Sequence, residues 1–349
     1  MNPIKTSSEL EHMHIFITID YELHLSHNPG SVMSTLITPT KILSELLNEF
    51  GIKATFFVDM AYVMALEKLT EKYDTASMDM QLIRNQLSYL IEQGHSLQLH
   101  IHPQWFYSEF DGKNWQMDFN HCMLSDMDYD KAFNLFASAK LLLESISGQS
   151  PVAYRAGGYS LQTFSDHVKL LYSNGIKIDS SVLPGKKVTT RTNNYDYLNL
   201  PKRKYSFTNS VTEPSENGIL FELPLSTVFY NPLIYIILKK SLQYKHHFRP
   251  YSNGFWQTGV NGPGMYRMLS QLFQLKVVCA SIDGPMSGLL PQVYMKFKEI
   301  SPGSDFVIIG HPKNFSPESI RLTRKFIANS LREGRYVTIP EKIEAASNF

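Results

Sequence analysis

The sequence predicts an α/β protein built from parallel strands, with its functional groups at the carboxyl ends of those strands. The first observation is a recurring unit, in which an amphipathic helix is followed by a glycine and then by a short apolar run. Strands that alternate with helices in this way are typical of parallel sheets. The second observation is that five predicted strands end in acidic, histidine or arginine residues, an arrangement typical of a (β/α) barrel with its site at one face.

The helix–glycine–strand unit occurs five times. In each copy a glycine stands where the apolar periodicity of the helix stops, and glycine adopts the left-handed conformation of a helix end at little cost. These glycines are Gly51, Gly94, Gly148, Gly175 and Gly334. Thr38 and Pro39 add an N-cap and a first-turn proline to the first helix. The spread of the unit predicts a single domain over residues 1–349.

Residues 186–286 depart from this unit. The region is rich in Tyr, Asn, Pro and Gly, and within it we predict strands only at 219–225 and 275–282. Because no linker composition sets it apart, we interpret it as an irregular insertion that covers the open face of the barrel. Residues 225–238 are apolar but shorter than the roughly 20 residues of a membrane span. We predict a buried or lid element there, with peripheral membrane contact as the alternative.

Composition excludes several classes of function. The chain has 33 Lys and Arg against 32 Asp and Glu, so its net charge of +1 creates no field that recruits nucleic acid. Its two cysteines, Cys122 and Cys279, are far apart, which argues against a disulfide framework and against a CxxC metal site. No apolar segment precedes the first strand, so we expect no secretory signal and a cytoplasmic location.

The strand ends carry the candidate functional residues. Alternation puts Asp20 and Glu22 on one side of the first strand, and His100 and His102 on one side of another. Three further strands end in Arg155, Asp179 and His311. A capping carboxylate or a solvated histidine is the simpler explanation at any one end, but five such ends are hard to obtain by chance.

Two strands supply the candidate metal ligands. Glu22, His100 and His102 form a carboxylate–imidazole–imidazole set suited to Zn²⁺ or a similar divalent ion, with positions left open for water and substrate. Such a site can acidify a water and polarise a carbonyl group. The set therefore predicts a divalent cofactor, for which Zn²⁺ is the first choice.

The remaining strand ends supply acid–base groups. Asp20, two residues from Glu22, is placed to take a proton from water, and Arg155 can hold its carboxylate by a bidentate pair. His311 can donate a proton to a leaving nitrogen, and Asp179 is the candidate partner that orients its ring. Together these groups predict metal-assisted hydrolysis of an amide.

In order and spacing, these residues resemble the motifs of the NodB-homology polysaccharide deacetylases, the fourth carbohydrate esterase family. The similar segments are TIDYE at 18–22, KATFFVD at 53–59, GHSLQLHIHP at 94–103, AYRAGGY at 153–159, IDSSV at 178–182 and IIGHP at 308–312. The resemblance implies a deformed (β/α) barrel and a divalent metal. It also implies that Asp20 is the base, Arg155 its partner and His311 the general acid.

The sequence departs from the family pattern at two metal ligands. The acid motif reads Asp-Tyr-Glu, so the metal carboxylate is Glu22, one position further on than in the family. The family's second histidine would fall at Gln104. We assign the second imidazole ligand to His102, which shares a face with His100, and keep Gln104 or a water as the alternative.

The expected substrate contacts come from the third motif and from tryptophans. By resemblance, the Gly158 amide is a candidate oxyanion donor, and Tyr159 lies beside it. Trp105 and Trp256 are candidate platforms for stacking a sugar ring, for which packing in the core is the alternative.

The leading functional expectation is a metal-dependent hydrolase that removes an acetyl or formyl group from the nitrogen of an amino sugar. A nucleotide- or lipid-linked sugar fits the expected location better than an extracellular polymer does. Hydrolysis of a non-sugar carbon–nitrogen bond is a second interpretation. A catalytically silent carbohydrate-binding barrel, suggested by Gln104, is a third.

Overall fold

A computed structural model describes residues 13–161, 167–245, 247–255 and 275–347. Its main sheet consists of β1 (Met13–Tyr21), β2 (Thr55–Asp59), β3 (Ser96–Ile101), β6 (Ala153–Ala156), β7 (Ile178–Asp179), β10 (Tyr205–Phe207), β11 (Leu220–Glu222), β14 (Phe306–Gly310) and β15 (Gly334–Tyr336). Three two-stranded sheets pair β4 (Glu109–Phe110) with β5 (Trp115–Gln116), β8 (Lys187–Thr189) with β9 (Asn194–Asp196), and β12 (Thr227–Tyr230) with β13 (Lys276–Cys279).

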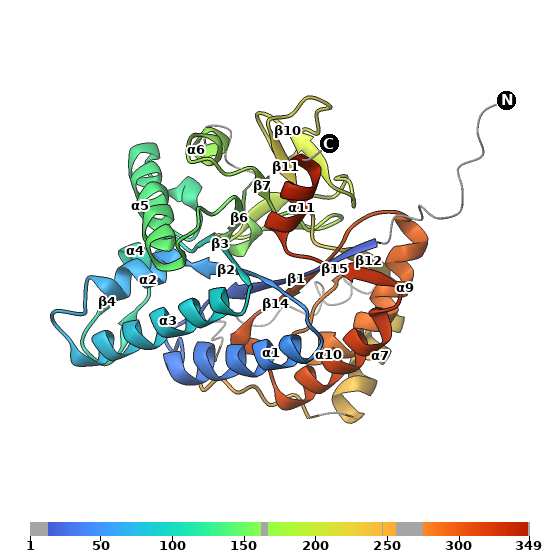
Figure 1. Ribbon diagram of the computed structural model, residues 1–349, viewed down its shortest axis with the longest axis horizontal. Coiled ribbons are helices and arrows are strands. Elements are labelled where there is room, and N and C mark those ends of the chain that lie inside the picture. Colours follow the sequence, from blue (N-terminus) through green and yellow to red (C-terminus); the bar gives the residue numbers. More distant parts are fainter. Residues whose placement is uncertain (1–12, 162–166, 246, 256–274, 348–349) are drawn as a thin grey trace.

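The longer helices lie outside the sheet (Figure 1). The α-helices are α1 (Thr38–Glu49), α2 (Met60–Glu67), α3 (Asp74–Glu92), α4 (Gln104–Tyr107), α5 (Tyr129–Ser147), α6 (His167–Ser173), α7 (Pro232–Lys245), α9 (Leu290–Ile300), α10 (Pro317–Ser330) and α11 (Ile339–Ser347). Short helical turns are η1 (Met33–Ile37), η2 (Leu124–Asp126), η3 (Gly157–Tyr159), η4 (Gly284–Gly288) and η5 (Pro312–Asn314).

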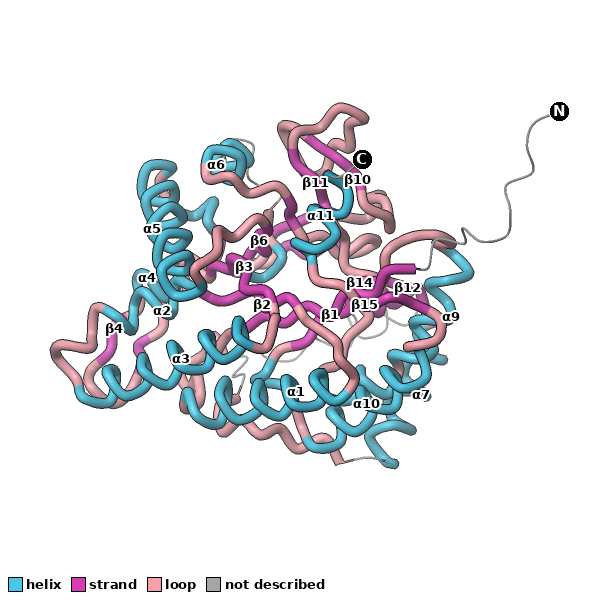
Figure 2. Tube along the Cα trace, viewed as in Figure 1, coloured by secondary structure: helices cyan, strands magenta, loops and turns pink. Residues whose placement is uncertain are grey.

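The main sheet is parallel from β11 to β14 and curls into a deformed (β/α) barrel. Its strand order is β10-β11-β7-β6-β3-β2-β1-β14, with β15 also paired to β1, and only β10 runs antiparallel to its neighbour. The segment after β11 brings the two sides together, because Ser226 N donates to Val307 O of β14 at 3.1 Å. Figure 2 shows the strands in the middle of the molecule and the helices around them. The predicted fold class is confirmed.

Residues of β1 are buried on both faces of the sheet. Ile15, Ile17 and Ile19 alternate with Phe16 and Thr18, and all five side chains are buried. A strand of a (β/α) barrel has this property, because one face meets the surrounding helices and the other meets the barrel interior. The alternation carries Asp20 to the interior side at the carboxyl end of the strand.

Four of the five predicted helix-end glycines have left-handed backbone conformations, and Gly334 does not. Gly148, for example, ends α5 with a φ of 68°. Gly334 instead opens β15, where a Cβ atom would lie 2.5 Å from Cδ1 of Ile15. A glycine is required there for close approach to β1. The predicted order of helix, glycine and strand is present, but Gly334 begins β15 and does not end α10.

Part of the region 186–286 belongs to the barrel itself. The predicted strand at 219–225 is β11, which pairs with β7 inside the main sheet. The predicted strand at 275–282 is β13, which pairs with β12 outside it. The apolar run 225–238 forms β12 and the start of α7, where Leu233 and Ile237 are exposed by 58% and 66%. Within the described ranges, no helix is both long enough and apolar enough to cross a membrane.

Candidate active site

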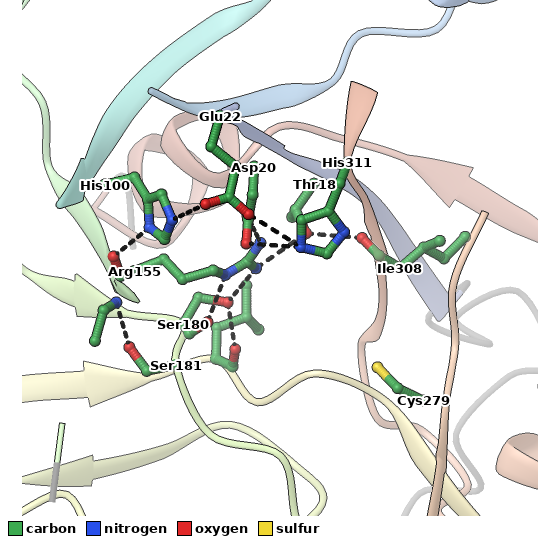
Figure 3. A network of polar contacts seen from close by, with 12 residues as sticks. Thr18, Asp20, Glu22, His100, Arg155, Ser180, Ser181, Cys279, Ile308 and His311 are labelled. Carbon is green, nitrogen blue, oxygen red and sulfur yellow. Dashed lines mark hydrogen bonds and ion pairs between the residues drawn. The ribbon is translucent and has the colours of Figure 1, made fainter. Parts of the chain in front are cut away.

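Polar side chains from several strand ends converge at the carboxyl mouth of the barrel (Figure 3). Asp20 and Glu22 come from the end of β1, His100 from β3, Arg155 from β6 and His311 from the residue after β14. Parallel neighbours end at the same edge of a sheet, so strand pairing alone brings these groups together. Every one of the five is buried or nearly so.

The predicted metal ligands lie within reach of one shared ion. Glu22 Oε2 is 2.6 Å from His102 Nε2 and 3.5 Å from His100 Nε2, and each of the three residues is at most 5% exposed. Glu22 Oε2 and His100 Nε2 have no hydrogen-bond partner in the described structure. His100 Nδ1 lies 2.7 Å from Arg155 O, and donation to that carbonyl leaves a lone pair on Nε2. The unpartnered atoms and the mixed N/O donors fit a divalent ion such as Zn²⁺.

Arg155 holds Asp20 at the centre of a buried network. Its Nη1 donates to Asp20 Oδ1 at 2.6 Å, while Nη2 donates to Thr18 and Ser180 and Nε to the Ser180 carbonyl. The expected bidentate pair is therefore a single contact, because the other N–H groups of the guanidinium bind Thr18 on β1 and Ser180 in the loop after β7. Burial alone would raise the pKa of Asp20, but the Arg155 guanidinium and the His311 ring lower it below its usual range.

His311 faces both carboxylates of β1 and is oriented by Asp283. Its Nε2 lies 3.5 Å from Asp20 Oδ2 and 3.6 Å from Glu22 Oε1. Its Nδ1 lies 2.6 Å from Asp283 Oδ2, and its backbone N–H donates to Asp283 Oδ1 at 2.8 Å. Burial would lower the pKa of His311, but Asp283 and Asp20 raise it to about 10. The two carboxylates thus favour the protonated form of the ring.

The expectation that Asp179 orients His311 is wrong. Asp179 ends β7, where its Oδ1 accepts a hydrogen bond from Ser181 Oγ at 2.7 Å. It lies opposite Glu222 in the register of β7 and β11, and Glu222 Oε1 accepts from Val182 N at 3.0 Å. These two carboxyl groups therefore shape the 180–182 loop, which in turn contacts Arg155. Asp179 thus supports the site through this loop and through its electrostatic interaction with Arg155.

We expect Glu222→Gln to flatten the dependence of stability on pH. Burial and the neighbouring Asp179 charge raise the pKa of Glu222 well above its usual range. Between the unfolded and folded pKa values the native state holds a proton that the unfolded chain releases, so stability falls as pH rises above about 4.5. The variant has no carboxyl group at this position and does not show this loss. The difference in free energy of unfolding, variant minus wild type, should therefore increase by about 1 kcal/mol or more from pH 5 to pH 8.

Urea unfolding at the two pH values measures this difference. Glu216→Gln, which changes an exposed side chain of the same region, is the matched control and should follow wild type. A Glu222→Gln protein with the same pH dependence as wild type would show that Glu222 is ionised in the native state.

Lys313 and Asp59 belong to the site but were missed by the sequence analysis. Lys313 Nζ donates to Glu22 Oε1 at 2.8 Å and to Leu23 O at 3.3 Å, and the residue is 8% exposed. Lys313 therefore binds Oε1, and Oε2 is the oxygen that faces His100 and His102. Asp59, at the end of β2, accepts the His102 N–H at 3.1 Å. It marks a sixth strand end with a polar side chain, so the strand-end argument could have found it, whereas nothing in the sequence signalled Lys313.

Trp105 is a core residue, and the expectation that it stacks on a sugar is wrong. It is fully buried on α4, with its ring centroid 4.8 Å from that of Tyr62 and 5.1 Å from that of Trp115. The chain turns into α4 directly after His102, and this turn carries the indole under the surface instead of into the mouth of the barrel. The other candidate platform, Trp256, lies outside the described residues.

We expect Trp105→Ala to lower the free energy of unfolding by about 3–5 kcal/mol, because it opens a large cavity in the aromatic cluster. Phe106→Ala is the matched control, since Phe106 is 40% exposed and its loss should cost about 1 kcal/mol or less. Urea unfolding measures both values. Equal losses in the two variants would contradict a core role for Trp105.

Gly158 and Tyr159 lie beside the candidate ligands. Gly158 has a φ of 59° and lines a cavity together with His102. Tyr159 has a φ of 63° and is the one non-glycine residue with positive φ in the described ranges. Burial, and next the Asp20 carboxylate, raise the pKa of Tyr159 well above its usual range. A strained backbone of this kind is typical of functional sites.

No family model and no curated protein matches the sequence, whereas solved structures do match the fold. A protein of Mycobacterium smegmatis described as a polysaccharide deacetylase matches with a TM-score of 0.49 and 17% identity, over 99% of this chain and 94% of that one. The peptidoglycan deacetylase PdaC from Bacillus subtilis matches with a TM-score of 0.39 and 11% identity, over 97% and 93% of the two chains. These matches include the family that the sequence motifs resemble.

A GH57 branching enzyme from Thermococcus kodakaraensis matches with a TM-score of 0.50 and 10% identity, over 95% of this chain and 71% of that one. At this identity, the likeness establishes that the two chains share a fold, and it says nothing about the reaction.

Proposed function

We propose that this protein is a metal-dependent hydrolase of the polysaccharide deacetylase type, which removes a short acyl group from the nitrogen of an amino sugar. The observation that carries the proposal is the joint geometry of three parts in one buried site. These parts are the donor set Glu22, His100 and His102, the Asp20–Arg155 pair, and the His311–Asp283 pair.

Each part has a distinct role. A divalent ion held by Glu22, His100 and His102 would polarise the acyl oxygen and acidify a water. Asp20 is the base that takes the proton from this water, and Arg155 keeps its carboxylate ionised and oriented.

The third part acts on the leaving group. His311 donates a proton from Nε2 to the leaving nitrogen, and Asp283 keeps the ring turned toward that atom. Because His311 Nε2 and Asp20 Oδ2 are 3.5 Å apart, acid and base can act on the two sides of one tetrahedral carbon.

The substrate class rests on the motif resemblance described above. An N-acyl amino sugar supplies both the amide to be cleaved and hydroxyl groups for the polar mouth of the barrel. A lipid-linked sugar is one form of this substrate, because exposed apolar residues of α7, among them Leu233 and Ile237, offer a surface for a lipid. A nucleotide-linked sugar is another form.

A second candidate is a carbohydrate-binding barrel without turnover, and Lys313 favours it. Its ammonium group lies 2.8 Å from Glu22 Oε1 and neutralises that carboxylate without a metal. In such a protein the same residues would bind a sugar and would not cleave it.

One experiment separates the two functions. The protein is purified in Zn²⁺-containing buffer, its metal content is determined by elemental analysis, and amine release from N-acetylglucosamine oligomers is followed before and after chelation. The hydrolase should hold about one metal per chain and lose amine release with it. A protein that holds no stoichiometric metal and releases no amine contradicts the hydrolase, and binding of the oligomers would then support the binding barrel.

A further inference from the structure

A small cavity of about 100 Å³ opens beside the candidate metal ligands. Its polar side includes His102, Gln104 and Asn193, and its apolar side includes Leu25 and Phe119. It therefore touches a candidate ligand directly, and none of Asp20, Arg155 and His311 lines it. At about 30 Å³ for a water molecule, its volume accommodates a group of roughly three non-hydrogen atoms.

Gln104 is the unusual residue of this cavity. Its side chain is 4% exposed, and its Oε1 has no hydrogen-bond partner in the described structure. A buried amide oxygen without a partner costs about 1–3 kcal/mol, so its retention points to a ligand that satisfies it. The position would carry a metal-binding histidine in the family that the sequence resembles. Here His100 and His102 of the same segment already face Glu22.

The rest of the wall is suited to carbon atoms. Leu25 is 7% exposed and Cys122 is 3% exposed, and both border the cavity. Burial raises the pKa of the Cys122 thiol to about 11, so it stays neutral and contributes an apolar surface. A group that fits this cavity therefore has a short carbon stem and one end that forms hydrogen bonds.

We propose that this cavity is a specificity pocket, in which Gln104 binds a hydroxyl group carried by a short substituent of the sugar. A hydroxyl group can pair with either end of the Gln104 amide, because it can donate to Oε1 or accept from the NH₂ group. Leu25, Phe119 and Cys122 contact the carbon to which the hydroxyl group is attached. The inference rests on the proposed function for its occupant, an N-acyl amino sugar, and assigns Gln104 to the substrate rather than to the metal.

The test compares Gln104→Met with wild type on N-acetylglucosamine and on its 3-, 4- and 6-deoxy analogues. Dissociation constants are measured by calorimetry, kcat/KM by amine release, and metal content by elemental analysis. Wild type should discriminate against the 6-deoxy analogue by about 10-fold or more, because this analogue lacks the hydroxyl group of the hydroxymethyl substituent and leaves the buried amide unpaired. The 3- and 4-deoxy analogues lack only ring hydroxyl groups and should bind like the parent sugar. Gln104→Met should weaken binding of the parent sugar by a similar factor, lose that discrimination and keep its metal.

Two further variants keep the test decisive. Gln116→Met changes an exposed glutamine that does not line the cavity and should leave all values at wild-type levels. Cys122→Leu adds volume to the cavity wall and retains Gln104. It should raise KM for the parent sugar by about 10-fold, with metal content unchanged.

The outcomes test the pocket and the hydrolase reaction independently. Loss of metal in Gln104→Met would make Gln104 a ligand and overturn the inference, as would unchanged binding and discrimination in that variant. A wild-type protein that binds none of the four sugars overturns it as well. A protein that binds the parent sugar through Gln104 but releases no amine supports the pocket and contradicts the hydrolase.

Discussion

Replacing Asp20 with asparagine is expected to lower turnover by about 10²–10⁴-fold, the usual contribution of a general base, while bound metal stays at the wild-type level. Asparagine keeps the oxygen that accepts from Arg155 Nη1 at 2.6 Å, so the network around the guanidinium is retained. The variant loses the negative charge that takes a proton from water. Because Asp20 contacts Arg155 and His311 rather than His100 and His102, metal content should not follow turnover.

His100→Ala is the matched variant, because it removes a candidate ligand from the same site. Its Nε2 is buried without a hydrogen-bond partner, so the loss should lower metal content and turnover together. Elemental analysis and amine release are measured on the same preparations. Equal metal loss in the two variants would make Asp20 a ligand and would refute this division between base and metal site.

The sequence was sufficient to predict the residues that strand geometry alone brings together. Side chains alternate along a strand and parallel strands end at one edge, so Asp20, Glu22, His100 and Arg155 could be placed from their positions in the chain. The barrel itself follows from the same alternation of helices and strands. Neither inference needs the conformation of a loop.

The errors and omissions lie where loops decide the contacts. Asp283 follows β13 closely and could have been considered, but only the closure of the barrel beside β14 brings it to His311. Asp179 ends a strand as predicted, yet the register of β7 with β11 pairs it with Glu222. Trp105 is buried because the chain turns into α4 two residues earlier. Such turns depend on tertiary packing, which alternation along one strand does not encode.

Lys313 illustrates a second limit. A lysine three residues beyond a strand is expected to be an exposed charge in most sequences, because lysine is almost never fully buried unless it is paired. Here η5 folds the chain back over the end of β1, and the ammonium group reaches Glu22 Oε1 at 2.8 Å. The partner that makes its burial favourable lies 291 residues away in the chain.

Replacing His311 with alanine is expected to slow hydrolysis of an amide far more than hydrolysis of an activated ester. An amine leaves only after it has gained a proton, so loss of the donor should lower kcat/KM for an N-acetyl substrate by about 10²–10⁴-fold. A nitrophenolate leaves without a proton, so 4-nitrophenyl acetate should lose about 10-fold or less. The His311 ring is well placed for this role, since Asp283 and Asp20 raise its pKa to about 10 and keep it protonated.

Asp283→Asn separates the donor from the residue that positions it. Its amide oxygen can still accept from Nδ1, but the charge that raises the pKa of His311 is lost. The variant should therefore show a smaller loss on the amide than His311→Ala, and little loss on the ester. If His311→Ala slowed both substrates equally, the ring would serve a step that they share, such as binding the acyl group, and the leaving nitrogen would take its proton from another donor.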